Sequence, residues 1–108
     1  MDALVVPTTN TTLVIPFAEL MHAEAEGSYT RLHLDGDRHQ LVSKRIGSLE
    51  QSLPTALFFR CHESHVVSLS KVRRIDTVDG LTVELVNGKR VPVARRRYAE
   101  FLQVLRGK

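Results

Sequence analysis

Short alternating segments separated by tight-turn signals constrain the fold of this chain more than any other feature. Asn87-Gly88 is the strongest of these signals, because Asn-Gly favours the two-residue turn of a β-hairpin. It lies between the alternating segments 81–85 and 90–93, and further turn signals occur at residues 27–28, 35–37 and 79–80. Segments of this length and alternation predict half-buried antiparallel strands. The chain is therefore expected to be mainly β, with about eight to ten short strands.

Strict alternation in two neighbouring segments predicts which side chains face the core. Residues 21–26 alternate apolar with polar side chains, and residues 29–34 do the same after the turn at Gly27-Ser28. The members expected to face inward are Met21, Ala23, Ala25, Thr30, Leu32 and Leu34. Tyr29, Arg31 and His33 are expected to face outward.

Two short helices complete the predicted architecture. Ser43 can cap a first helix, whose apolar residues at 46, 49 and 53 repeat at helical spacing before Pro54 ends it. Near the C-terminus, apolar residues at 98, 101, 102 and 105 form a stripe that docks on a sheet. Residues 66–69 fit either a helical turn or the start of a strand. Residues 1–12 lack periodicity and are interpreted as a tail or linker, which leaves 13–108 as the folded domain.

Charge is distributed unevenly along the sequence. Residues 1–59 hold four Lys/Arg against seven Asp/Glu, whereas residues 60–108 hold eleven against five. A basic half favours a polyanionic partner, although a solvated basic face would give the same count. The sequence predicts a soluble, cytoplasmic protein with no membrane association. It has a single cysteine, no basic N-terminal region before an apolar run, and no run of about 20 apolar residues.

Cations cluster where both predicted helices begin. Ala94 is a poor helix cap, and Arg95, Arg96 and Arg97 follow it near the positive end of the helix dipole, where exposed cations are unfavourable. Lys44 and Arg45 repeat the pattern at the first helix. Helix N-termini bind phosphate readily, so this placement indicates an anionic ligand. The alternative is that these side chains pair with carboxylates on the sheet.

Four ordered segments resemble a known family. The stretch FFRCHESHVVSLSKV, from residue 58, resembles the F-x-R-x-H-R-S-x-x-V-N-x-x-x-I signature of LytTR DNA-binding domains. Residues 24–30 resemble its E-A-x-G-N-Y-T turn, residues 46–53 its L-x-x-L-E-x-x-L helix, and residues 86–96 its hairpin with a V-S-R end. The resemblance covers about residues 13–106. Glu63 stands where the family usually has Arg, and Ser68 where it usually has Asn.

The resemblance implies a fold, a partner and a set of contact residues. It implies layered antiparallel sheets whose loops, with the Arg-rich helix start, read the major groove of double-stranded DNA. By matched position the implied DNA-binding residues are Tyr29, Thr30, Lys44, His62, Glu63, Ser64, Arg95, Arg96 and Arg97. It also implies a bacterial transcription regulator, homodimer binding to repeated half-sites, and a receiver or sensor domain in a longer chain. Physically, Arg96 suits a guanine edge and Tyr29 a phosphate or a thymine methyl, unless Tyr29 covers the sheet.

Glu63 leaves three interpretations open. Its carboxylate accepts from a cytosine amine, or it pairs with an arginine such as Arg60, or the protein has lost or changed its DNA preference. The third interpretation defines an alternative function, in which the chain is a regulatory or protein-interaction module.

Enzymatic and metal-binding functions find little support in the sequence. His62-Glu63-Ser64-His65 is one residue short of the zinc motif H-E-x-x-H, whose histidines must share a helical face. Dyads of adjacent residues such as Cys61-His62 point to opposite faces of a strand and lack an oxyanion loop. We therefore expect no enzyme, no cofactor and no metal, and we expect Cys61 to be a small core residue.

Overall fold

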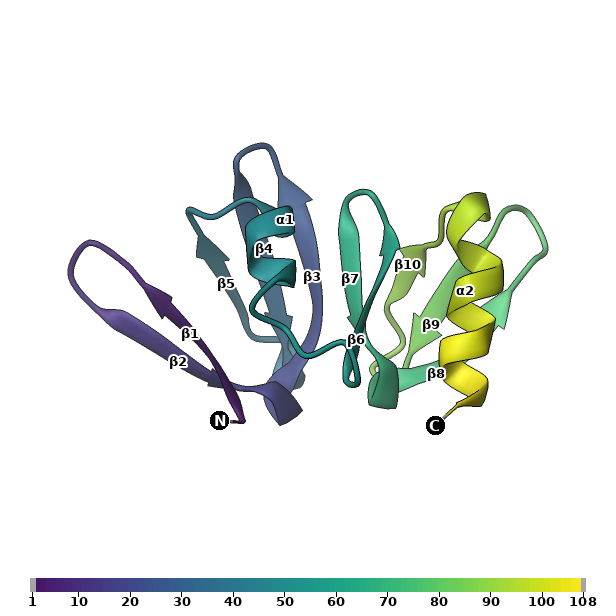
Figure 1. Cartoon of the computed structure of the whole chain (residues 1–108), viewed down its shortest axis with the longest axis horizontal. Helices are drawn as coiled ribbons and strands as arrows, with labels where there is room; N and C mark the ends of the chain where they lie inside the picture. Colours follow the sequence, from purple (N-terminus) through teal and green to yellow (C-terminus); the bar gives the residue numbers. More distant parts are fainter. Residues whose placement is uncertain (1, 108) are drawn as a thin grey trace.

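Over residues 2–107, which the computed structural model describes, the chain forms ten β-strands, two α-helices and three short 3-10 turns (Figure 1). This confirms a mainly β fold. The strands are β1 (Ala3–Pro7), β2 (Thr12–Pro16), β3 (Leu20–Glu26), β4 (Tyr29–Leu34), β5 (His39–Val42), β6 (Phe58–His62), β7 (His65–Ser68), β8 (Val72–Asp76), β9 (Thr82–Leu85) and β10 (Arg90–Pro92). The helices are α1 (Ile46–Glu50) and α2 (Arg95–Arg106).

The strands form three antiparallel sheets that lie side by side along the long axis (Figure 1). β1 and β2 form a hairpin, the central sheet has the order β5-β4-β3-β7-β6, and the third sheet has the order β10-β9-β8. Helix α1 packs against β3 and β7, and α2 packs against β6. The predicted Asn87-Gly88 turn joins β9 to β10, with Gly88 at φ 86°, a backbone conformation that suits glycine.

Two hydrophobic cores lie on opposite faces of the central sheet. The first core joins the β1–β2 hairpin, the central sheet and α1, and contains Val66. The second joins the central sheet, the third sheet and α2, and contains Val67 and Phe101. Because successive side chains of β7 point to opposite faces, Val66 and Val67 enter different cores. Residues 65–68 are therefore a strand, which decides between the two structures that the sequence left open.

The N-terminal segment corrects the sequence interpretation. Residues 3–7 are not a tail but strand β1, which pairs with β2 over its full length. Leu4 and Val6 are each 1% exposed and belong to the first core, whereas Val5 between them is 44% exposed. Because β1 is short and has apolar side chains on both faces, its sequence does not alternate between apolar and polar residues. The sequence therefore gives no signal for this strand.

The start of α1 and one residue of β3 also differ from prediction. Helix α1 begins after Arg45, which makes no side-chain cap, so Ser43 does not cap it. His22 alternates with the inward-facing Ala23 and yet is only 4% exposed, because the second core covers the outer face of β3. The pairing of β3 with β4 shifts in register between Leu20 and His22. Met21 lies at this shift and packs in the second core rather than in the first. Thr30, Leu32 and Leu34 face inward as predicted.

Candidate nucleic-acid interface

Four segments far apart in sequence end at one edge of the molecule (Figure 1). They are the β3–β4 turn, the residues just before α1, the β6–β7 turn and the N-terminus of α2. We call this edge the turn face and define it by Gly27–Thr30, Lys44–Arg45, Arg60, His62–Ser64 and Arg95–Arg97. All the predicted DNA-binding residues belong to it.

Hydrogen bonds tie the four segments to one another. The backbone N–H of Ala25 donates to the carbonyl of Ser64 at 2.9 Å, which joins β3 to the β6–β7 turn. The N–H of Ala94 donates to the carbonyl of Cys61 at 2.8 Å, which fixes the start of α2 beside β6. The hydroxyl of Thr30 donates to the carbonyl of Lys44 at 2.6 Å, which links β4 to the segment before α1. The turn face is therefore one connected structure.

Arg60 connects α1, the β6–β7 turn and α2 through its half-buried side chain and its backbone carbonyl. Its Nη1 donates to Oε1 of Glu50 on α1 at 2.8 Å, and its Nη2 donates to the backbone carbonyl of Glu63. In turn, the carbonyl of Arg60 accepts from Nε of Arg97 at 2.9 Å. Two adjoining surface hollows share Glu50 and Arg60 in their walls: one reaches Glu63 and Arg96, and the other reaches Gly27 and Arg45.

The three arginines at the start of α2 have different surroundings. Arg95 and Arg96 are exposed, and within residues 2–107 their guanidiniums have no hydrogen-bond or ion-pair partner. Arg97 is half-buried: Nη1 lies 3.1 Å from Oε1 of Glu100, and its guanidinium carbon lies 4.9 Å from the centre of the Phe59 ring. Among the described residues, none of the three arginines pairs with a carboxylate on the sheet, because the partner of Arg97 is Glu100 of the same helix. The helix starts at Ala94 without a side-chain cap, as predicted.

The β3–β4 turn offers one exposed contact residue and one buried one. Tyr29 is 47% exposed at the start of β4, directly after Gly27-Ser28, so part of its side chain is accessible to a ligand. Thr30 is 0% exposed, which corrects its inclusion among the predicted contact residues. Its hydroxyl is used internally to hold the carbonyl of Lys44, whose own side chain is exposed.

The β6–β7 turn carries the remaining predicted residues. Nδ1 of His62 accepts a hydrogen bond from the backbone N–H of Ser64 at 3.0 Å, and both side chains are half-buried. Glu63 is exposed at the tip, and in the described part of the chain its carboxylate has no ion-pair partner. The interpretation that Glu63 pairs with Arg60 is therefore wrong, because Arg60 pairs with Glu50 and contacts only the carbonyl of Glu63.

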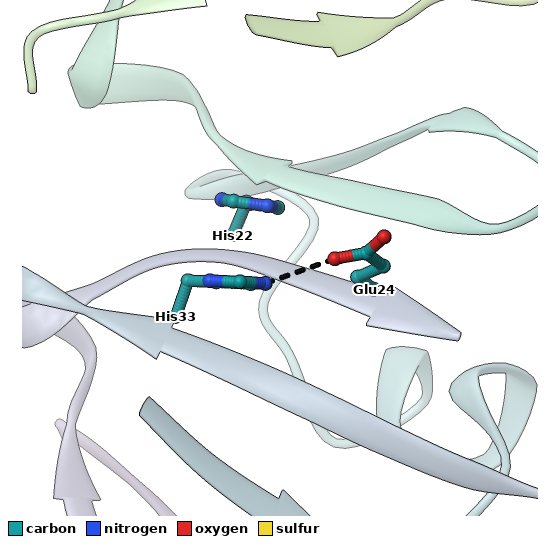
Figure 2. A group of neighbouring side chains, drawn as sticks. All are labelled: His22, Glu24 and His33. Carbon is teal, nitrogen blue, oxygen red and sulfur yellow. Dashed lines mark hydrogen bonds and ion pairs between the residues drawn. The ribbon is translucent and has the colours of Figure 1, made fainter. Parts of the chain in front are cut away.

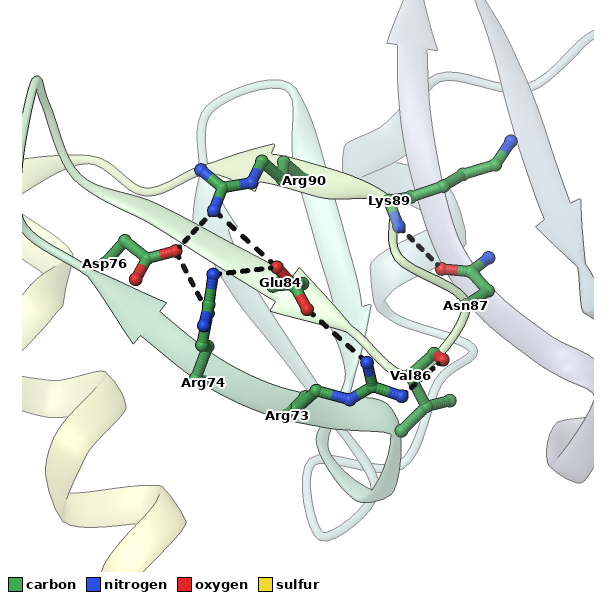
Figure 3. A network of polar contacts seen from close by, with 8 residues as sticks. All are labelled: Arg73, Arg74, Asp76, Glu84, Val86, Asn87, Lys89 and Arg90. Carbon is green, nitrogen blue, oxygen red and sulfur yellow. Dashed lines mark hydrogen bonds and ion pairs between the residues drawn. The ribbon is translucent and has the colours of Figure 1, made fainter.

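Much of the remaining positive charge is neutralised on the third sheet (Figure 3). Arg74 and Arg90 both pair with Asp76 and Glu84 across β8, β9 and β10, with the closest contact, from Arg90 to Asp76, at 2.8 Å. Arg73 lies 3.5 Å from Glu84. In the C-terminal half, Arg73, Arg74 and Arg90 are thus paired on the third sheet, whereas Arg95 and Arg96 of the turn face have no partner among residues 2–107.

Sequence reasoning missed Arg60 as a member of the turn face and Glu50 as its ion-pair partner. Arg60 occupies the arginine position of the F-x-R-x-H pattern, and that position was the available signal for it. Its pairing with Glu50 joins residues on different elements, so no local periodicity could reveal it. Cys61 is buried at 0% exposure, as predicted, and burial raises the pKa of its thiol to about 12.

Comparison with known proteins gives a consistent result. The family model described as "LytTr DNA-binding domain" matches residues 10–106. A solved LytTr DNA-binding domain from Bacillus cereus superposes with a TM-score of 0.79 at 26% identity, covering 97% of each chain.

Two curated bacterial regulators illustrate the sequence similarity. The transcriptional regulatory protein YpdB of Escherichia coli K12 is 30% identical over 86% of this chain and 39% of its own length. The heme-containing CO-sensing transcriptional regulator RcoM 1 of Paraburkholderia xenovorans is 26% identical over 89% of this chain and 37% of its own length. The chain therefore spans less than two fifths of these relatives. Within residues 2–107, neither helix has the length and apolar character needed to cross a bilayer.

Proposed function

This chain belongs to the LytTr DNA-binding domain family, and from this premise we propose that it binds double-stranded DNA sequence-specifically through its turn face. In this proposal it acts as the DNA-binding part of a bacterial transcriptional regulator located in the cytoplasm. A homodimer on repeated half-sites and a receiver or sensor domain in a longer chain are parts of the same proposal, and they rest on family resemblance.

One observation carries the proposal. The guanidiniums of Arg95 and Arg96, which have no partner among the described residues, lie at the uncapped start of α2, beside the other three segments of the turn face. Exposed cations at a helix N-terminus are unfavourable in the free protein. Phosphate or guanine contacts would compensate them, because guanidinium donors match both acceptors in a bidentate geometry. Arg95 and Arg96 have no intramolecular partner among the described residues that would explain their placement.

The surroundings of each side chain suggest a division of roles. We assign base reading to Arg96 and phosphate contacts to Arg95 and Lys44, because all three are exposed on the turn face. Tyr29 is assigned a phosphate or thymine-methyl contact. Arg97 is a positioning residue, since its guanidinium holds the carbonyl of Arg60 and Glu100. Thr30 has a similar positioning role through Lys44.

A selection from random duplexes followed by salt titration tests the proposal. The selected site should bind with an affinity that falls steeply with salt, with a log–log slope of about 0.9 per phosphate contact. Arg96→Ala should weaken binding to that site by roughly 1–3 kcal/mol, about 5- to 150-fold, and relax the preference at one base position. Arg106→Ala, at the far end of α2, removes the same charge and should leave the preference unchanged. Equal behaviour of the two variants on every duplex would refute the assigned surface.

The exposed carboxylate of Glu63 supports a second candidate function, a protein-interaction module of altered DNA preference. Glu63→Arg separates the two candidates. If the turn face lies on DNA, this variant should strengthen binding to all duplexes, steepen the salt slope by about 0.9 through one added phosphate contact, and change one base preference. Glu19→Arg makes the same charge change on the 3-10 turn Phe17–Glu19, at the opposite edge of the molecule (Figure 1). A Glu63→Arg variant that binds DNA as the Glu19→Arg variant does would favour the interaction module.

A further inference from the structure

A cluster of histidines lies on the face of the central sheet opposite the first core. His22 and Glu24 alternate on β3 with the core residue Ala23, and His33 lies across from His22 on β4 (Figure 2). The possible ligand atoms of His22, Glu24 and His33 all lie within 4.8 Å of one another. His65 of β7 is the register partner of Glu24, and its ring centre lies 6.3 Å from that of His22.

The nitrogens of this cluster are poorly satisfied by the protein itself. Nε2 of His33 lies 3.0 Å from Oε1 of Glu24, which accounts for one ring nitrogen. Nδ1 of His22, His33 and His65 are each buried without a hydrogen-bond partner among the described residues. Buried polar atoms normally find partners, so unpartnered imidazole nitrogens on three neighbouring strands are unusual. One ligand atom from each of His22, Glu24 and His33 is close enough to the others to share one ion.

We propose that this cluster binds a transition-metal ion of the Zn²⁺ class, with His22, His33 and Glu24 as ligands and His65 completing a four-ligand set. Imidazole nitrogens with one carboxylate oxygen match the ligand preference of Zn²⁺, and four protein ligands match a closed tetrahedral site. The ion would join β3, β4 and β7 on the side that faces the third sheet. This site is separate from the turn face and does not depend on the function proposed there.

Coordination requires a local rearrangement that is small but measurable. The rings of His22 and His33 are stacked, with centres 4.1 Å apart and planes 6° apart, so their in-plane lone pairs run parallel. Zinc–nitrogen bonds of about 2.0–2.1 Å need converging lone pairs. One ring, that of the half-buried His33, therefore turns out of the stack and exchanges its hydrogen bond with Glu24 for a shared metal ion.

Some charged neighbours of the histidine cluster favour a bound cation and others oppose it. Glu24 supplies the negative charge that favours a cation, while Lys89 of the β9–β10 turn approaches from the third sheet and extends toward the central sheet (Figure 3). Arg31 is also close to His33, and His62 is close to His65.

Zinc titration of the untagged chain, stripped of metal by a chelator, tests the proposal. We expect one Zn²⁺ per chain by calorimetry and by metal analysis after dialysis. The melting temperature should rise by at least ~5 °C at saturating Zn²⁺, because only the folded state holds the ligands together. In ¹⁵N spectra the imidazole signals of His22, His33 and His65 should shift, and that of His39 should not. Absence of stoichiometric binding in the wild-type chain would overturn the proposal.

Variants distinguish this site from binding elsewhere on the protein. His33→Gln and Glu24→Gln replace half-buried residues and should each weaken Zn²⁺ binding at least ~10-fold. His39→Gln is the matched control, because Nδ1 of His39 contacts the Arg31 guanidinium at 2.7 Å and His39 is exposed on β5. Lys89→Gln removes the opposing cation and should tighten binding. Zinc affinity that falls in His39→Gln but not in His33→Gln or Glu24→Gln would place the ion elsewhere and refute the assignment.

Discussion

Replacing Phe101 by alanine is expected to lower the free energy of unfolding by about 3–5 kcal/mol. Phe101 is 0% exposed at the centre of the second core, and its ring stacks on that of Phe59 with centres 4.9 Å apart. Truncation leaves a cavity between α2 and β6 that the surrounding strands fill only partly. Because a domain of this size is stable by about 5–15 kcal/mol in total, the loss is a large share of its stability, and urea denaturation measures it.

Leu102→Ala is the matched control on the same helix. Leu102 is half-buried and adjoins Phe101 in sequence, but it is not part of the second core. Its truncation should cost less than half as much as that of Phe101. Phe101 also anchors the helix that presents Arg95 and Arg96, so Phe101→Ala should lose DNA binding at temperatures where the wild-type chain keeps it. Similar free energies for the two variants would show that α2 is not held mainly by Phe101.

Lowering the pH from 7 to 5 is expected to cost the metal-free protein about 2 kcal/mol of stability through His22 alone. Burial, followed by the nearby His33, His65 and Lys89, lowers the pKa of His22 from 6.5 to about 3. Below pH 6.5 the unfolded chain therefore takes up a proton at His22 that the folded chain binds only near pH 3. Stability is complete above pH 6.5 and falls as the pH decreases toward 3. The pKa values of His33 and His65 are lowered too, so these residues act in the same direction.

Urea denaturation at several pH values in the presence of a chelator measures this effect. His22→Gln removes the titrating group while keeping a polar side chain, so its stability should depend on pH less steeply between pH 5 and 7. The remaining slope reports His33 and His65, whose surroundings include Glu24, Arg31 and Lys89. An unchanged slope in His22→Gln would contradict the burial of a neutral imidazole at this position.

Local sequence patterns predicted the parts of this fold that local physics determines. The Asn87-Gly88 turn and the inward face of β4 depend on residues within a few positions of one another. The uncapped, arginine-rich start of α2 was predicted for the same reason. Of the stripe predicted on α2, Phe101 and Leu105 pack in the second core, whereas Leu102 lies outside it. Motif resemblance added the family, which the match over residues 10–106 confirms.

The features that were missed depend on contacts between distant elements. The sequence predicts a tail where β1 lies, because the burial of β1 is decided by its pairing with β2 and by the first core. The burial of His22 has no signal in the alternation of β3, because the third sheet that covers its outer face is distant in the sequence. The pairing of Arg60 with Glu50 and the orphaned nitrogens of the histidine cluster likewise arise only when the sheets assemble.

The hydrogen bond from Arg60 to the tip of the β6–β7 turn has a consequence for the evolution of such a protein. Arg60 holds the main chain at position 63, while the side chain there is left without a partner in the described structure. The conformation of the main chain at position 63 therefore does not depend on which side chain is present there. Under the proposed function, replacing the residue at position 63 would change the operator that is bound without altering the scaffold that presents this residue.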